Sequence, residues 1–137
     1  MAEMVRRAQY FYTMAPDKAG EGARALQVLK DAGVNLLAFS GFPAGKRSQL
    51  DFVPEDPGAF RAAAKGAKWK VKGPKVCFLV EGDDRTGVCA EILGRLATAR
   101  INVTATDAVV AGAGRFGAIL WVKPRDVKKA AQVLGAS

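Results

Sequence analysis

The chain has 137 residues, half of them hydrophobic and a quarter charged, which is typical of a soluble globular protein. It contains no histidine, so the usual general base, the orienting member of a catalytic triad and the commonest metal ligand are all missing. The net charge of +8 is compatible with a polyanionic partner or with a solvated basic surface. No run approaches the roughly 18 apolar residues of a membrane helix, and no stretch reads as a secretory signal. We expect a cytoplasmic protein without catalytic residues, resident metal, cofactor or membrane contact.

The first half of the chain predicts four strands and two helices. In chain order, the strands are expected over residues 9–15, 34–42, 49–53 and 69–72, which are rich in aromatic and β-branched residues. Apolar residues at helical spacing between the first two strands predict a helix that stops at Gly33. Pro57 is expected at the start of the second helix, where proline is tolerated.

The second half repeats this pattern at an offset of 67 residues. The matched pairs are Asp17 and Asp84, Gly20 and Gly87, Leu26 and Leu93, Leu29 and Leu96, Asn35 and Asn102, and Pro57 and Pro124. Matches spread along the whole unit at one offset indicate a duplication. We place the boundary at the turn dipeptide Gly73-Pro74, which gives one repeat over residues 1–73 and a second over residues 74–137.

The order strand, helix, strand, strand, helix, strand predicts an α+β fold. Each repeat should form a ferredoxin-like βαββαβ unit, an antiparallel sheet with its helices on one face. The second repeat ends at Ser137, just after its second helix, and lacks its own last strand. Because a bare sheet edge invites pairing, we expect the two repeats to pack together or the chain to form a homodimer.

A loop joins the first strand to the first helix in each repeat. Asp17 and Asp84 stand where a helix N-cap is expected, and Gly20 and Gly87 follow three residues later. Capping by aspartate and a turn at glycine account for these residues structurally. A helix N-terminus also attracts a carboxylate or phosphate, and glycine lets a ligand approach the backbone, so the loops are candidate binding elements.

Asn35 and Asn102 are placed just inside the second strand of each repeat. Asparagine is disfavoured in strands, so each is either a turn residue that satisfies local backbone groups or a binding group. In the second interpretation, each asparagine lies beside the loop and meets the amino group of a ligand.

Residues 17–36 (DKAGEGARALQVLKDAGVNL) and 84–103 (DRTGVCAEILGRLATARINV) resemble the opening of ACT domains. That family typically has an Asp-Arg-Pro-Gly-like loop, an amphipathic helix and a Gly-(Val/Ile)-Asn-(Ile/Leu) start of the second strand. In this sequence Ala19 and Thr86 replace the common proline. The resemblance extends over both repeats and implies the ferredoxin-like fold.

The resemblance also implies a function and a set of binding residues. ACT domains bind amino acids at interfaces between paired domains, usually to regulate an enzyme. Here it implies a non-catalytic regulatory module for an amino acid or similar small carboxylate, with a metabolic enzyme as a possible partner. The implied ligand-binding residues are Asp17, Lys18, Ala19, Gly20, Glu21, Asn35, Leu36, Asp84, Arg85, Thr86, Gly87, Val88, Asn102 and Val103.

Nucleic-acid binding is one alternative, because RNA-recognition domains have the same strand order. Residues 115–121 (RFGAILW) faintly resemble their aromatic strand motif, and five lysines lie within residues 65–75. The matching strand of the first repeat, however, carries Asp51, and we expect Phe116 and Trp121 to serve the core or an interface. Nucleic acid is therefore not the partner that we expect.

Two further alternatives are an enzyme and a purely structural or protein-interaction module. Candidate catalytic groups would be Cys89, Glu91 and Asp107, but no base stands at a recognisable spacing from them. Cys89 also falls on a repeat position that is held by Gly22. We expect both Cys77 and Cys89 to be small hydrophobic residues in a reducing compartment.

Overall fold

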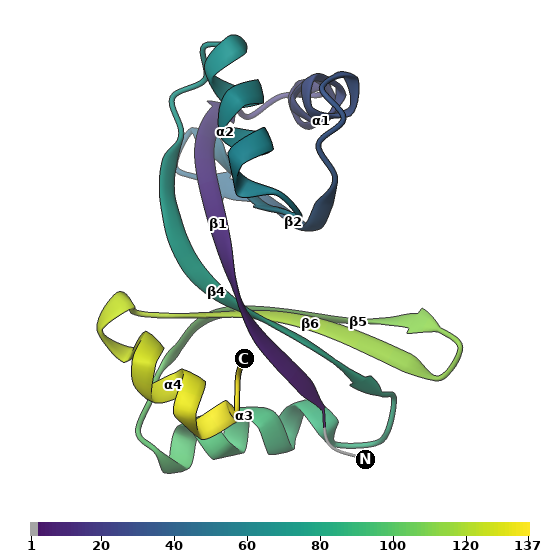
Figure 1. Ribbon diagram of the computed structural model, residues 1–137, viewed down its shortest axis with the longest axis vertical. Helices are drawn as coiled ribbons and strands as arrows, with labels where there is room; N and C mark the ends of the chain where they lie inside the picture. The colour runs from purple at the N-terminus through teal and green to yellow at the C-terminus, as the bar shows by residue number, and fades with distance from the viewer. Residues whose placement is uncertain (1–2) are drawn as a thin grey trace. The chain divides into compact units, whose positions relative to one another are not determined.

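The computed structural model describes residues 3–137 and divides them into two compact units (Figure 1). The central unit contains residues 9–75, and the terminal unit contains residues 3–8 together with residues 76–137. The chain passes between them inside β1 (Met4–Pro16) and β4 (Lys72–Asp83), so each of these strands contributes residues to both units. This division differs from the two sequence halves mainly in where it places residues 3–8.

The central unit has the βαββαβ order that the sequence predicts. Its elements are residues 9–16 of β1, α1 (Glu21–Asp31), β2 (Leu36–Ala44), β3 (Arg47–Pro54), α2 (Pro57–Gly66) and residues 72–75 of β4. The strands lie in the order β2-β3-β1-β4, with β3 antiparallel to both neighbours. Pro57 is the first residue of α2 and directly follows the N-cap Asp56. The Asp56 carboxylate accepts hydrogen bonds from the amides of Gly58 and Ala59.

The terminal unit repeats this architecture. Its elements are residues 76–83 of β4, α3 (Val88–Thr98), β5 (Val103–Gly112), β6 (Arg115–Val122), a 3-10 turn η1 (Pro124–Asp126), α4 (Val127–Leu134) and residues 4–8 of β1. The strands lie in the order β1-β4-β6-β5. The predicted ferredoxin-like α+β fold is confirmed.

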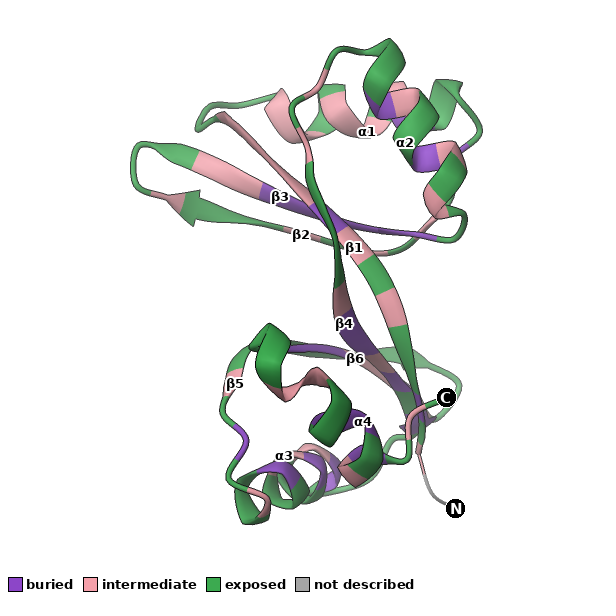
Figure 2. Ribbon diagram, turned by 60° about the vertical axis from the view of Figure 1, so that its left-hand side comes forward, coloured by how far each residue is buried: buried purple, intermediate pink, exposed green. Residues whose placement is uncertain are grey.

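Each unit has a core between its helices and one face of its sheet (Figure 2). In the central unit the rings of Phe11, Phe52 and Phe60 are fully buried, and the Phe60 ring contacts the other two. In the terminal unit Phe78 and Leu96 are fully buried at 0% exposure. These side chains come from strand positions on one face and from the apolar stripe of each helix, which explains why the repeat is visible in the sequence.

The start of β1 supplies the strand that the second repeat was expected to lack. Val5 is only 6% exposed and lies in the core cluster of Phe78 and Val80. The Ser137 amide donates to the Val5 carbonyl at 3.1 Å, and the Arg7 amide donates to the Ser137 carbonyl at 3.2 Å. The open edge predicted for residues 74–137 is therefore occupied, because a segment distant in sequence pairs there.

The last strand of the central unit begins later than predicted. Residues 69–71 are not strand, and β4 starts at Lys72. Trp69 and Val71 pack against the core of the central unit, and the Thr13 hydroxyl donates to the Lys70 carbonyl at 2.8 Å. Core packing and the hydrogen bond from Thr13 thus hold this segment in place without the regular backbone hydrogen bonds of a strand.

Asp51 is a buried carboxylate on the sheet of the central unit. It is 5% exposed and alternates along β3 with Leu50 and Phe52, which lie in the core, so it points to the face opposite the helices. The Gln49 side-chain amide donates to it at 2.9 Å. Burial raises the pKa of Asp51 above its ordinary value, against smaller lowering effects from Gln49 and the positive charge of Lys75.

We expect Asp51→Asn to raise the free energy of unfolding at neutral pH. The carboxyl has a higher pKa in the folded chain than in the unfolded chain, so its ionisation disfavours folding. This penalty is absent below the ordinary pKa of 3.8, grows as the pH rises, and is complete above the folded pKa. Urea unfolding of both proteins at several pH values measures the difference. A difference that does not change with pH would contradict this account.

Candidate functional site

The N-termini of α1 and α3, which the sequence predicts as binding elements and which we call the helix entrances, have the same backbone geometry. The N-caps of α1 and α3 are Gly20 and Gly87, with φ of 91° and 82° in the left-handed region that glycine tolerates. No side chain of either N-cap residue holds the first-turn amides. The Glu21 amide donates to the Lys18 carbonyl at 3.4 Å and the Val88 amide to the Arg85 carbonyl at 3.3 Å, so the second and third amides of each helix are the ones that could meet an acceptor from outside the helix.

The prediction that Asp17 and Asp84 cap these helices is wrong. Asp17 accepts a hydrogen bond from the Ser48 hydroxyl at 3.0 Å, and the Asp84 amide donates to the Gly114 carbonyl at 2.8 Å. Both aspartates thus tie the loop to the start of the third strand in their unit. The local sequence cannot reveal this, because Ser48 lies 31 residues from Asp17.

The other predicted loop residues differ in accessibility. Lys18, Ala19 and Thr86 are exposed. Val88 is 5% exposed in the core of the terminal unit, so only its backbone could face a ligand. The Glu21 side chain is 13% exposed and forms an ion pair with Arg24 at 3.5 Å.

The asparagines lie at the opposite end of each unit from the loops. Asn35 directly precedes β2, and its side-chain amide donates to Glu55 at 3.4 Å, just after the end of β3. Asp17 contacts Ser48 near the start of β3, an eight-residue strand that spans roughly 25 Å at about 3.3 Å per residue. The structure therefore does not bring loop and asparagine together within the central unit.

The terminal unit shows the same separation. Asp84 is bonded to Gly114 just before β6, whereas Asn102 directly precedes β5, whose first residue Val103 pairs with Val122 at the far end of β6. The interpretation in which each asparagine lies beside the loop of its own repeat is thus wrong. Leu36 and Val103, the residues after the asparagines, are half-buried against the two cores.

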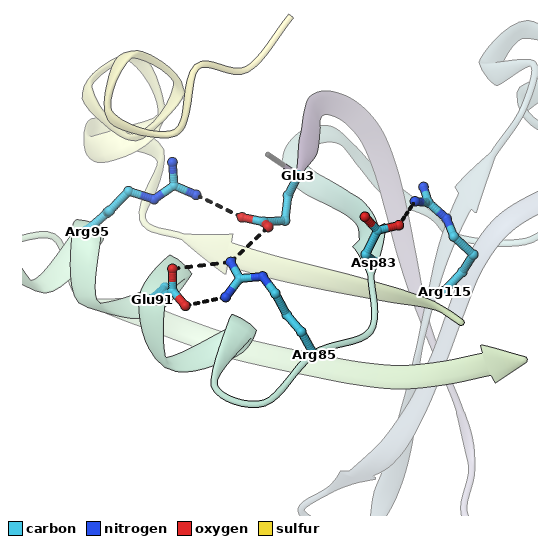
Figure 3. Close-up of polar contacts among 6 residues, drawn as sticks. All are labelled: Glu3, Asp83, Arg85, Glu91, Arg95 and Arg115. Atoms are coloured by element: carbon cyan, nitrogen blue, oxygen red, sulfur yellow. Dashed lines mark hydrogen bonds and ion pairs between the residues drawn. The ribbon is translucent and has the colours of Figure 1, made fainter. Parts of the chain in front are cut away.

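A network of charged side chains lies beside the entrance of α3 in the terminal unit (Figure 3). Arg85 donates to both carboxylate oxygens of Glu91, and its Nη2 also contacts Glu3 Oε2 at 3.1 Å. Arg95 Nη2 lies 3.7 Å from Glu3 Oε1. The Glu3 side chain is only 6% exposed, so a nearly buried carboxylate is held between two guanidinium groups.

Hydrogen bonding within this network shifts the acid–base behaviour of its members. The hydrogen bond to Glu91 raises the pKa of Arg85, and the hydrogen bond to Glu3 raises it by a smaller amount. The hydrogen bond from Arg85 lowers the pKa of the Glu91 carboxyl. Both shifts favour the charged forms, so Arg85 and Glu91 form an ion pair at neutral pH.

The network lines an open cleft with a volume of about 980 Å³. Its charged walls are Glu3, Arg85, Glu91 and Arg95, and its remaining lining comes from Gly94, Thr98, Ala99 and Val133. The sequence interpretation did not identify Glu3, Arg95 or Val133 as site residues. Glu91 and Arg95 stand four residues apart on α3, which is a signal of shared surface, but the role of Glu3 depends on long-range pairing of β1.

The residues considered for other functions do not converge on a reactive centre. Cys89 packs against the core of the terminal unit, and Asp107 is exposed on β5. Phe116 and Trp121 are 4% and 6% exposed, so these rings are not displayed for stacking on bases. Within residues 3–137, no three acidic or cysteine side chains gather as metal ligands. No helix in the same range has the length and apolar character to span a membrane.

No family model and no curated protein sequence matches the chain, but solved structures resemble it. A protein from Bacteroides thetaiotaomicron has a TM-score of 0.80 at 18% identity, over 97% of this chain and 88% of its own. The ligand-free regulatory subunit of aspartate kinase from Thermus thermophilus has a TM-score of 0.67 at 15% identity, over 98% and 96%. The corresponding subunit from Thermus flavus gives 0.62 at 16%, over 98% and 95%. The chain therefore has the fold of the ACT-type regulatory domains of aspartate kinase.

Proposed function

We propose that the protein is a regulatory module that binds an amino acid or similar small carboxylate and catalyses no reaction. The observation that carries this proposal is the pair of helix entrances at Gly20 and Gly87, where glycine takes the place of a capping side chain. The open amides and the positive end of the helix dipole favour a carboxylate at each entrance. The likeness to regulatory subunits supports a regulatory role and a metabolic enzyme as the partner.

The proposal includes a homodimer. Because Asn35 and Asn102 lie far from the loops of their own units, a pocket containing both elements needs a loop and an asparagine from different units, and we propose that a second copy supplies one of them. Edge strands β2 and β5 offer surfaces for such pairing. Their exposed apolar side chains are Leu37, Phe39, Phe42, Val109 and Val110.

A thermal-shift screen of the full chain against the twenty standard amino acids tests the binding function. A ligand at about 100 times its Kd stabilises the folded state by roughly 2.7 kcal/mol, which is readily detected. Nucleotides and acetate in the same screen show whether any carboxylate or phosphate suffices. A flat screen would contradict the proposal and leave a structural role.

Charge-matched variants locate the ligand at the entrances. Gly22→Glu and Ala90→Glu add a carboxylate to the first turn of α1 and α3, and Gly22→Gln and Ala90→Gln are the neutral controls. Ala90 is exposed and nothing lies within 4 Å of a side chain built at Gly22, so these changes are sterically free. We expect the glutamate variants to weaken binding by about 10-fold relative to the glutamine variants, measured by calorimetry.

A further inference from the structure

The cleft of the terminal unit carries charges of both signs that are balanced within it. We propose that this cleft binds a small zwitterion, a molecule with one carboxylate, one ammonium group and a short apolar body. The cleft is a different site from the helix entrances proposed above, and the two proposals are tested by different variants. Its occupant is recognised by side chains, whereas an entrance would recognise a carboxylate through backbone amides.

The charge balance selects a zwitterion over a simple ion. Glu3 and Glu91 would repel an added anion, and Arg85 and Arg95 would repel an added cation. A ligand that carries both charges can place each one opposite its complement. Charge-assisted hydrogen bonds of this kind are stronger than neutral ones and would fix the ligand in one orientation.

Two of the charged groups have capacity left for a ligand. Arg95 Nη2 lies 3.7 Å from Glu3, and the Arg95 side chain is 45% exposed, so its guanidinium, which has five N–H donors, is accessible to a ligand. Glu91 is 60% exposed, and its oxygens have lone pairs beyond those that Arg85 uses. We therefore assign the ligand carboxylate to Arg95 and the ligand ammonium to Glu91.

The spacing of these two residues fits a small molecule. Glu91 and Arg95 are four residues apart on α3, so their Cβ atoms lie about 6 Å apart on one face of the helix. Gly94 lies beside them, and nothing lies within 4 Å of the position that a Cβ would take there. Ala99 and Val133 complete an apolar part of the lining, on which the body of the ligand can rest.

The central unit has different residues at the matching positions. At the repeat offset of 67, Glu91 and Arg95 correspond to Arg24 and Val28, and Gly94 corresponds to Gln27. The core positions Leu29 and Leu96 are the same in both repeats. The two repeats thus share a fold, whereas the charged pair and the missing side chain occur only in the terminal one.

Three probes that share the isobutyl group of leucine test the ligand class on the full chain. Leucine carries both charges, 4-methylpentanoate lacks the ammonium group, and 3-methylbutylamine lacks the carboxylate. Calorimetry should detect binding of leucine and at least about 10-fold weaker binding of the other two. Equal binding of 4-methylpentanoate would indicate a simple anion site and overturn the proposal, as would the absence of leucine binding.

Three variants locate the probe. Arg95→Val installs the residue of the central unit, Glu91→Gln removes the ammonium partner, and Gly94→Gln fills the cleft while every charge remains. Each should weaken leucine binding by about 10-fold or more, and Arg24→Gln on the exposed face of α1 should leave it unchanged. Circular dichroism checks that each variant folds. Gly94→Gln changes no charge, so it tests the cleft even if the charge variants disturb the ion-pair network. If Ala90→Glu weakens binding and the cleft variants do not, the cleft proposal fails and the entrance proposal survives.

Discussion

Deletion of residues 1–8 is expected to destabilise the terminal unit by about 3 kcal/mol or more. Full burial of Val5 alone contributes roughly 1.5–3 kcal/mol, and its removal leaves a cavity beside Phe78 and Val80. The deletion also removes the strand beside β4 and the backbone bonds of Ser137, and it leaves Arg85 and Arg95 without Glu3. Unpaired backbone groups at a former interior strand add to the loss.

The two tryptophans allow the loss to be assigned to one unit. Trp121 belongs to the terminal unit and Trp69 to the central unit, so Trp69→Phe and Trp121→Phe chains each report on one of them. Urea unfolding followed by fluorescence should show a large fall in the midpoint reported by Trp121 after deletion. None of residues 3–8 belongs to the core of the central unit, so the Trp69 midpoint should fall less. An equal fall for both reporters would contradict the assignment of residues 3–8 to the terminal unit.

Phe52→Ala is expected to destabilise the central unit by about 3–5 kcal/mol, the usual cost of removing a buried aromatic ring. Phe52 is fully buried on β3, and its ring lies 5.3 Å from that of Phe60 and 5.7 Å from that of Trp69. Loss of the ring removes its contacts with Phe60 and Trp69 and leaves a cavity, because the backbone of the sheet cannot move to fill the space.

Phe39→Ala is the matched control, since its ring also contacts Phe52 but is 38% exposed on the edge strand β2. We expect it to cost less than half as much as Phe52→Ala, because water already reaches the ring and no closed cavity forms. Urea unfolding followed by Trp69 fluorescence measures both variants. Similar losses would mean that burial on β3 is not what makes Phe52 important.

The repeat in the sequence predicts most of the fold because core positions follow local periods. Leu29 and Leu96 occupy the same turn of matching helices, and Phe11 and Phe78 occupy matching strand positions. Helix and strand periods are set by the backbone, so these positions can be identified without knowledge of tertiary contacts. The turn at Gly33, with φ of 72°, is local in the same sense, and Arg100 adopts the same left-handed conformation with φ of 61° in the second repeat.

The features that the sequence did not predict all depend on contacts between distant segments. Residues 4–8 (MVRRA) carry little strand signal, and only Val5 enters a core whose other members begin at Phe78. Asp17 resembles a helix cap until Ser48 is placed beside it, and Glu3 gains its role only when β1 lies next to β4. The candidate cleft could therefore be only partly predicted, from the spacing of Glu91 and Arg95 on one helix.

The division of β1 between two units has a consequence for biosynthesis. Residues 3–8 are translated before the central unit, but their partners in residues 76–137 are translated after it. The central unit, residues 9–75, is complete in sequence well before then and can acquire its core while translation continues. Until residues 76–137 have been translated, Val5 and its neighbours form a strand without a pairing partner. Nascent-chain chaperones or a fused amino-terminal tag would contact this strand before the native partner does.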